Sequence, residues 1–225
     1  MQFTTRPEIK GTFGVVASTH WIASAVGMKI LEAGGSAADA AAAMGFALHV
    51  VEPHLNGPLG DMPLLWRGAG DDTPQVLCGQ APAPAGATIA HYRAEGLDSV
   101  PGSGLLATVI PGAFGAWMAL LRDHGRLPLR ATLEPAIYYA RNGHPVLPRV
   151  AATIDGLSDF FRDEWPTSAA TWMPGDRAPK AWSLMRNPEL ADTWERLLSE
   201  AEAATGRAAQ IEAARHVFYE GFIAE

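Results

Sequence analysis

The stretch that most constrains the fold of this chain is SAADAAAAMGFALHVVEP, residues 36–53. Ser36 is a favoured N-cap residue and alanine is the best helix former, so the stretch predicts a helix over residues 37–51. Pro53 cannot continue that helix, because its ring clashes with the preceding turn. Since most of its side chains are small, we expect this helix to pack closely against a neighbour.

The segment before this helix predicts a strand followed by a second helix. Residues 11–19 have a β-branched centre between glycines and polar residues, which is typical of a buried strand. Residues 20–35 then predict a helix that Ser18 or Thr19 caps and that ends at its two final glycines.

The remainder of the chain mixes short strands with helices. Residues 62–68 and 74–79 are short apolar runs that predict a β-hairpin or two adjacent strands. Residues 165–188 hold four prolines and are expected to be irregular or made of short helices. Further helices are expected at residues 113–125, 133–142, 150–162, 189–205 and 208–218. The predicted fold class is therefore α+β.

Composition excludes several classes of protein. Of the 225 residues 48% are hydrophobic and 18% are charged, which is typical of a globular protein. The net charge of −7 argues against nucleic acid as a partner, because phosphate backbones attract clustered Lys and Arg. Residues 37–51, the most apolar window, are too short to cross a bilayer. The opening residues lack the apolar core of a signal peptide, so we expect a cytoplasmic protein with no membrane partner.

Motifs that carry common chemistries are missing from the sequence. G-x-S-x-G, G-x-x-x-x-G-K-[ST] and H-E-x-x-H do not occur, and the seven histidines never stand four residues apart. Cys78 is the only cysteine, so neither an intrachain disulfide nor a cysteine-rich zinc site can form. We therefore expect no metal and no cofactor. By residue type alone, His54 fits a loop histidine that is hydrogen-bonded to the backbone, Asp61 fits a turn or cap residue, and Cys78 fits a small buried apolar residue.

Several segments, taken in order, resemble one family. GVVASTHWIASAVGMKILEAGGSAADAAAAMGFALHVVEPH is similar to a family opening of the form ILxxGGNAxDAAVA…VxxPH. NGPLGD stands where that family has a Gly-rich turn, and APAGAT, TVIPGAFGAWMALLRDHGRLPLRATLEPAIYYARNGHPV and FYEGFIAE follow in the family's order. Over about residues 13–225 the chain resembles the γ-glutamyltransferase family of N-terminal-nucleophile hydrolases, in the amidohydrolase-like branch to which oxamate amidohydrolases belong.

The resemblance implies a protein made of two subunits. The family's precursor cuts itself, and both subunits contribute to a four-layer αββα sandwich. The new N-terminal Thr of the β subunit is the nucleophile, its α-amino group is the base, and a Gly-Gly pair of the same subunit forms the oxyanion hole. The chain resembles most of the α subunit, as one incomplete domain over 1–225 with an N-terminal arm at 1–12. An αβ heterodimer is expected, with a dimer of heterodimers as the alternative.

This chain holds no counterpart of the nucleophile. The family nucleophile lies in a TTH-like run, whereas Thr4-Thr5 is followed by Arg6 and precedes the domain. No catalytic residue is therefore assigned in this chain, and the nucleophile is expected at the N-terminus of the β subunit.

One departure from the family bears on the substrate. In the glutathione-cleaving members, an Arg in RExAPxxAT binds the α-carboxylate of the γ-glutamyl group. Alignment on residues 83–88 places Gln80 at that position, and a shifted alignment places Cys78 there. No Arg stands between Arg67 and Arg93. A neutral amide binds a carboxylate more weakly than a guanidinium does, so the pocket is expected to favour a small amide.

The expected function is therefore hydrolysis of the amide bond of a small substrate, as in the family's oxamate amidohydrolases and cephalosporin acylases. One alternative is a γ-glutamyl hydrolase or transferase whose carboxylate clamp comes from elsewhere. Another is a non-catalytic relative that acts as a binding or scaffold protein. The residues expected near the substrate are Gln80, Cys78 and Gly79, with His54 and Asp61 shaping the pocket.

Overall fold

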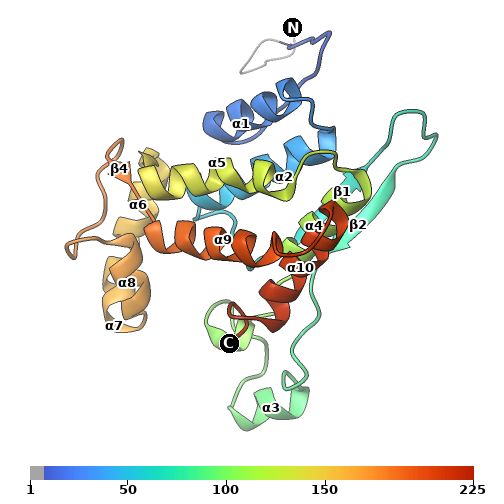
Figure 1. Ribbon diagram of the computed structural model, residues 1–225. Coiled ribbons are helices and arrows are strands. Elements are labelled where there is room, and N and C mark those ends of the chain that lie inside the picture. The colour runs from blue at the N-terminus through green and yellow to red at the C-terminus, as the bar shows by residue number, and fades with distance from the viewer. Residues whose placement is uncertain (1–7) are drawn as a thin grey trace, which may run out of the picture. The chain divides into compact units, whose positions relative to one another are not determined.

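The computed structural model describes residues 8–225, and these fold as two compact units (Figure 1). The first, here called the helical unit, holds residues 8–57 together with residues 120–225. The second, the hairpin unit, holds residues 58–119. The expectation of one domain over the whole chain stays a prediction, and part of the expected arm at 1–12 lies outside the described residues.

Five longer helices build the helical unit. Contacts join α1 to α2, α2 to α5, α5 to α9 and α9 to α10, and Figure 1 shows α5 and α9 side by side. Phe46 of α2 meets Trp194 of α9 edge-on, and Trp194 stacks on Phe218 of α10, so aromatic rings fill the space between these helices. The bounds are Trp21–Glu32 (α1), Ala37–Val51 (α2), Leu129–Asn142 (α5), Pro188–Ala201 (α9) and Arg207–Glu220 (α10).

The alanine-rich helix is confirmed as α2, and so is its close packing. Ala38, Ala42 and Ala43 are fully buried. At Gly27 of α1, an added Cβ would lie only 2.3 Å from the sulfur of Met44 on α2. Small residues on both helices therefore let α1 and α2 approach closely.

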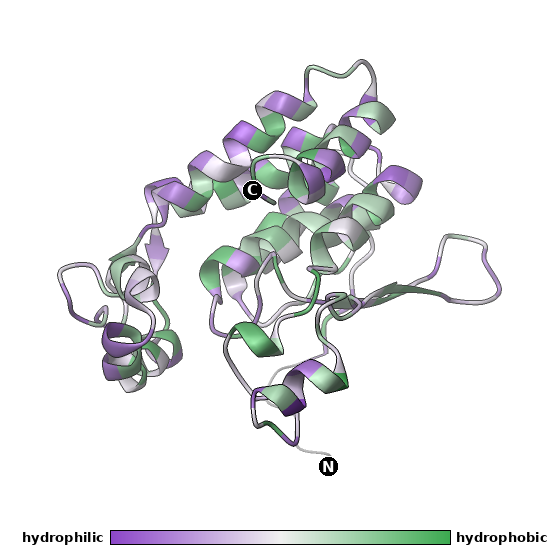
Figure 2. Ribbon diagram, turned by 90° about the horizontal axis from the view of Figure 1, so that it is seen from below, coloured by the Kyte–Doolittle hydropathy of each residue, from purple (hydrophilic) through white to green (hydrophobic). Residues whose placement is uncertain are grey.

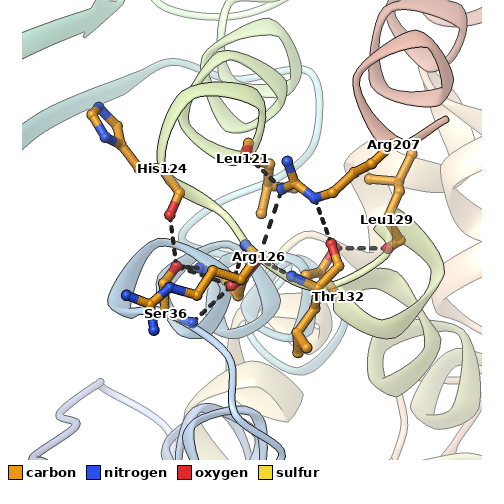
Figure 3. A network of polar contacts seen from close by, with 9 residues as sticks. Ser36, Leu121, His124, Arg126, Leu129, Thr132 and Arg207 are labelled. Atoms are coloured by element: carbon orange, nitrogen blue, oxygen red, sulfur yellow. Dashed lines mark hydrogen bonds and ion pairs between the residues drawn. The ribbon is translucent and has the colours of Figure 1, made fainter.

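The N-terminus of α2 is held by a buried carboxylate. Asp39 is fully buried and forms a capping box with Ser36, whose N–H and hydroxyl donate to Oδ2 at 2.8 and 2.9 Å. Oδ2 also accepts the N–H of Arg126 at 2.8 Å, and the guanidinium of Arg207 lies 4.0 Å from Oδ1. Arg207 in turn donates to the carbonyls of Leu127 and Leu121. Figure 3 shows Ser36, Arg126 and Arg207 around this network. Asp39 thus joins α2 to the loop before α5 and to α10.

The start of α1 differs from the prediction. Residues 11–19 are not a strand: they pair with no described strand, and Val15 is 52% exposed. A strand needs a neighbour for its backbone groups, and this segment has none among residues 8–225. The N-cap is His20, whose Nδ1 accepts the N–H of Ile22 at 3.1 Å, while the hydroxyl of Ser18 donates to the carbonyl of His20. Thr19 does not cap the helix either, because its hydroxyl binds Glu52.

A smaller group of short elements follows α5 in the helical unit. Gly143 ends α5 with a φ of 97°, and β3 (His144–Pro145) then pairs with β4 (Leu184–Met185). The single helix expected at 150–162 is two helices that meet at Leu157. The short helices of this group are α6 (Pro148–Gly156), α7 (Ser158–Asp163) and α8 (Pro166–Trp172). They pack around a small core that includes Val146, Val150, Ile154, Phe161, Met173 and Met185.

The hairpin unit contains the predicted β-hairpin. Its strands β1 (Met62–Trp66) and β2 (Gln75–Gly79) are antiparallel, which confirms the hairpin. Leu65 faces Val76 across the ladder, and these residues are 75% and 73% exposed, so the hairpin presents apolar side chains to its surroundings. The green of its strands in Figure 2 marks hydrophobic residues. The unit also holds α3 (Ile89–Ala94), the 3₁₀ helix η1 (Leu105–Ala107) and the start of α4 (Ala113–His124).

Two further features of residues 8–225 bear on the fold class and on whether a helix could cross a membrane. Its strands form two separate two-stranded sheets, so any sandwich layer built with them needs strands from elsewhere. Among the helices of residues 8–225, none combines the length and the apolar character needed to cross a membrane.

Candidate substrate-binding site

Four of the five candidate residues lie at one end of the hairpin. Cys78 and Gly79 are the last residues of β2, and Gln80 follows directly. The ladder pairs Met62 with Gly79, so Asp61 stands opposite Gln80, one residue beyond the last pair. Cys78, Gln80 and Asp61 are exposed, whereas Gly79 is buried. The register thus brings four of the candidate residues together, and their role near a substrate stays a prediction.

The side chains of Cys78 and Gln80 are in contact. The thiol of Cys78 points to Oε1 of Gln80, with the sulfur and oxygen 3.8 Å apart. A thiol is a weak donor, so this contact leaves the amide NH₂ of Gln80 available to a ligand oxygen. Cys78 is exposed and not buried, which corrects its interpretation as a small core residue. The end of β2 therefore offers a neutral polar edge.

Gly79 is required by the close approach of backbone to backbone. A Cβ on Gly79 would lie 2.6 Å from both the Cβ of Ala116 and the carbonyl oxygen of Met62. A Cβ on Gly112 would lie 2.2 Å from the carbonyl oxygen of Gly79. Only two glycines allow the end of β2 to press against the start of α4 in this way.

Hydrogen bonds hold the same three segments together. The carbonyl of Gly60 accepts the N–H groups of Gly112 and Ala113 at 3.1 and 2.9 Å. The N–H of Ile110 donates to the carbonyl of Pro82 at 3.1 Å. The start of β1, the residues after β2 and the N-terminus of α4 therefore converge around Asp61 and Gln80. Gly112 is a positioning residue that the sequence analysis missed, although its Pro-Gly pair stood within a motif of the resemblance.

His54 belongs to the helical unit and lies in a different cluster. It follows the end of α2, and both of its ring nitrogens are buried without a hydrogen-bond partner among the described residues. Burial lowers its pKa, the carboxylate of Glu52 opposes that shift, and the positive charge of Arg149 adds to it. His54 is therefore a neighbour of Glu52.

A buried acid lies at the centre of this second cluster. Glu52 is 4% exposed and accepts a hydrogen bond from the hydroxyl of Thr19. His20 is 1% exposed, and burial lowers its pKa although Glu52 acts in the opposite direction. Burial also lowers the pKa of His144 to about 4, with the charge of His20 adding to the shift. Sequence analysis missed this cluster, and its only sequence mark is an acid placed directly before Pro53.

Neither cluster resembles a metal centre. Throughout residues 8–225, no three His, Cys, Asp or Glu side chains come together in a way that would hold a metal ion.

The fold places the chain in a known class. The structure of Helicobacter pylori γ-glutamyltranspeptidase matches 97% of this chain with a TM-score of 0.83 and 27% identity, and the match covers 59% of that chain. The class is that of the N-terminal-nucleophile hydrolases, and the fold expected from the sequence is confirmed at this level. More specifically, the chain belongs to the γ-glutamyltranspeptidase family, whose model matches residues 23–225.

Relatives within the family carry several names. The glutathione hydrolase-like YwrD proenzyme of Bacillus subtilis is 32% identical over 216 residues, which are 96% of this chain and 38% of that protein. The oxamate amidohydrolase proenzyme of Klebsiella pneumoniae is 33% identical over 196 residues, which are 84% of this chain and 36% of that protein. A solved structure of LmbA2991 matches 99% of this chain at 56% identity with a TM-score of 0.96, and the match covers 38% of it. The chain thus spans well under half the length of these relatives.

Proposed function

We propose that this chain is the α-subunit part of a self-processing amidohydrolase that cleaves the amide bond of a small substrate. The nucleophile is the N-terminal Thr of a β subunit cut from the same precursor, and the two subunits form an αβ heterodimer. The proenzyme names of the Bacillus and Klebsiella relatives support the processing, and the oxamate amidohydrolase name supports the reaction.

The observation that carries the proposal is Gln80 at the end of β2. A guanidinium there would give a carboxylate two charge-assisted hydrogen bonds, each about twice as strong as a neutral one. Gln80 instead offers a neutral amide, and the carboxylate of Asp61 stands opposite it in the register. The α-carboxylate of a γ-glutamyl group therefore gains less at this position than it would beside a guanidinium.

A second candidate is hydrolysis or transfer of a γ-glutamyl group. The name of the Bacillus relative, glutathione hydrolase-like, favours this alternative. It requires a carboxylate clamp from outside the end of β2, since no Arg stands between Arg67 and Arg93.

The experiment uses the complete protein, with whatever its gene encodes beyond residue 225. Intact mass and N-terminal sequencing after purification report whether a second subunit beginning with Thr has formed. Hydrolysis is then measured on small neutral amides, on oxamate, which carries a carboxylate beside its amide, and on γ-glutamyl-p-nitroanilide. Hydrolysis of a small amide with little release of p-nitroaniline supports the proposal. Strong activity on the γ-glutamyl substrate alone overturns it. A protein that is neither processed nor active also overturns it and supports a non-catalytic scaffold protein.

The variant Gln80→Arg tests the role of the residue itself. We expect it to raise kcat/KM on the γ-glutamyl substrate at least tenfold relative to the amide, because it supplies the missing positive charge. Gln75→Arg is the matched control, since it places the same change at the exposed other end of β2. Equal effects of the two variants would count against a substrate contact at Gln80.

A further inference from the structure

A surface hollow in the helical unit lies between α1 and α5. Its volume is about 430 Å³, within the range of small-molecule sites. Ala25, Val26 and Lys29 line it from α1, and Glu134, Pro135, Tyr138 and Tyr139 line it from α5. None of these residues belongs to the hairpin end or to the cluster around Glu52.

The hollow contains two opposite charges that do not pair with each other. Lys29 and Glu134 are both exposed, and neither side chain forms a hydrogen bond or an ion pair with another residue of the described chain. On α5, by contrast, the exposed Arg141 is paired with Asp192. A cation on one wall and an anion on the other therefore face a shared space without neutralising each other.

Aromatic surface completes the lining. Tyr138 is 58% exposed, and its ring meets that of Tyr139 edge-on with centroids 5.3 Å apart. Pro135 lacks an N–H, so the carbonyl of Ala131 does not receive the helical hydrogen bond that this position normally donates. On α1, Trp21 stands four residues before Ala25, on the same helix face, and is 61% exposed. The hollow thus combines charge of both signs with ring faces.

We propose that this hollow binds a small zwitterion, namely a free α-amino acid with an aromatic side chain. Lys29 binds the carboxylate, Glu134 binds the ammonium group, and the Tyr138 ring packs against the side chain. The inference concerns a site separate from the hairpin residues, and it does not depend on the proposed amidohydrolase activity.

The charges of the hollow favour this ligand over simpler ones. A ligand with only a carboxylate would be attracted by Lys29 and repelled by Glu134. A ligand with only an ammonium group would be attracted by Glu134 and repelled by Lys29. Only a ligand that carries both charges gains from both walls. The exposed ring of Tyr138 adds a preference for an aromatic side chain, because offset or edge-on ring pairs contribute beyond simple burial.

Calorimetric titration of the complete protein tests the proposal with three probes. These are L-phenylalanine, 3-phenylpropionate, which lacks the ammonium group, and phenethylamine, which lacks the carboxylate. We expect measurable binding of L-phenylalanine and at least tenfold weaker binding of each of the other two. The proposal is overturned if L-phenylalanine does not bind, or if the singly charged probes bind as well as the amino acid.

Variants place the binding in the hollow. Lys29→Met and Glu134→Gln should each weaken L-phenylalanine binding at least tenfold, and the double exchange Lys29→Glu with Glu134→Lys should restore part of it. Lys180→Met and Glu164→Gln are matched controls, since both side chains are exposed and neither lines the hollow. Thermal melting checks that each variant is folded. Binding that all four single variants leave unchanged lies elsewhere in the protein and would refute the assignment.

Discussion

At the scale of single residues, Asp39 concentrates more stabilising contacts than any surface charge described above. Its carboxylate receives the backbone N–H groups of Ser36, Arg126 and Leu127, and it lies beside Arg207. A buried carboxylate keeps its charge in the interior only when such donors replace water. The residue therefore fixes the ends of three segments that are far apart in the sequence.

We expect Asp39→Asn to lower the free energy of unfolding by roughly 2–3 kcal/mol, because the amide turns its own N–H groups toward backbone donors. Urea unfolding of the complete protein measures this change. Asp192→Asn is the control, because that carboxylate is 69% exposed and pairs only with Arg141. Loss of this exposed ion pair should lower the free energy of unfolding by less than about 1 kcal/mol. A similar cost for both variants would show that the buried network does not stabilise the fold.

At the scale of elements, the contact between the end of β2 and the start of α4 depends on missing side chains. We expect Gly112→Ala to lower the melting temperature and the free energy of unfolding, by about 1–3 kcal/mol, because its Cβ would meet the backbone oxygen of Gly79 at 2.2 Å. Gly86→Ala is the matched control in the same unit, since a Cβ there has no neighbour within 4 Å.

The same variant should also move the candidate site, because the displaced backbone carries Gln80. Activity of Gly112→Ala on a small amide is therefore expected to fall more than that of Gly86→Ala. A Gly112→Ala protein with unchanged melting temperature and unchanged activity would contradict the close approach.

The elements that were predicted well are those specified by their own sequence. The alanine-rich helix α2, with Ser36 as its cap, and the β1–β2 hairpin depend on local propensity and on neighbours close in the chain. Residues 11–19 were predicted wrongly because a strand also needs a partner, and local apolar character does not supply one. The break at Leu157 was missed although Gly156 precedes it directly. Gly156 is still the last residue of α6, and a second helix begins at Ser158 almost at once, so the local sequence resembles one continuous helix.

The candidate site divides in a similar way. Asp61 lies near Cys78, Gly79 and Gln80 because a hairpin register converts sequence distance into proximity. The role of Gly112 was missed because it depends on a backbone approach from a distant segment. Whether the four residues contact substrate stays a prediction, as does a role for His54 in the pocket.

At the scale of the whole molecule, the described chain leaves apolar surface uncovered on the hairpin unit. Leu65 and Val76 form an exposed cross-strand pair, and Ile89 and Leu105 are 73% and 91% exposed. Monomeric proteins seldom expose many large apolar side chains together. The proposed β subunit, which would add strands to a shared sandwich, is a suitable cover for this surface.

The helical unit also carries several buried histidines whose pKa is lowered by burial. Burial lowers the pKa of His49 and of His144 to about 4, and it lowers the pKa of His20 as well. In the unfolded chain a histidine has a pKa of about 6.5, so between pH 6.5 and 4 the unfolded state binds more protons. Stability is therefore fully present above about pH 6.5 and decreases as the pH falls toward 4.

We expect His49→Leu to reduce this acid sensitivity. For a pKa that falls from 6.5 to about 4, one histidine accounts for roughly 2.5 kcal/mol of the stability difference between pH 7 and pH 4.5. Urea unfolding of the complete protein at both pH values measures that difference, with His216→Gln as the control for replacing an exposed imidazole. If His49→Leu and the unchanged protein lose the same stability on acidification, then His49 binds its proton at the same pH in the folded protein as in the unfolded chain. The burial that places its ring edge-on to Phe46 would then not exclude the charge.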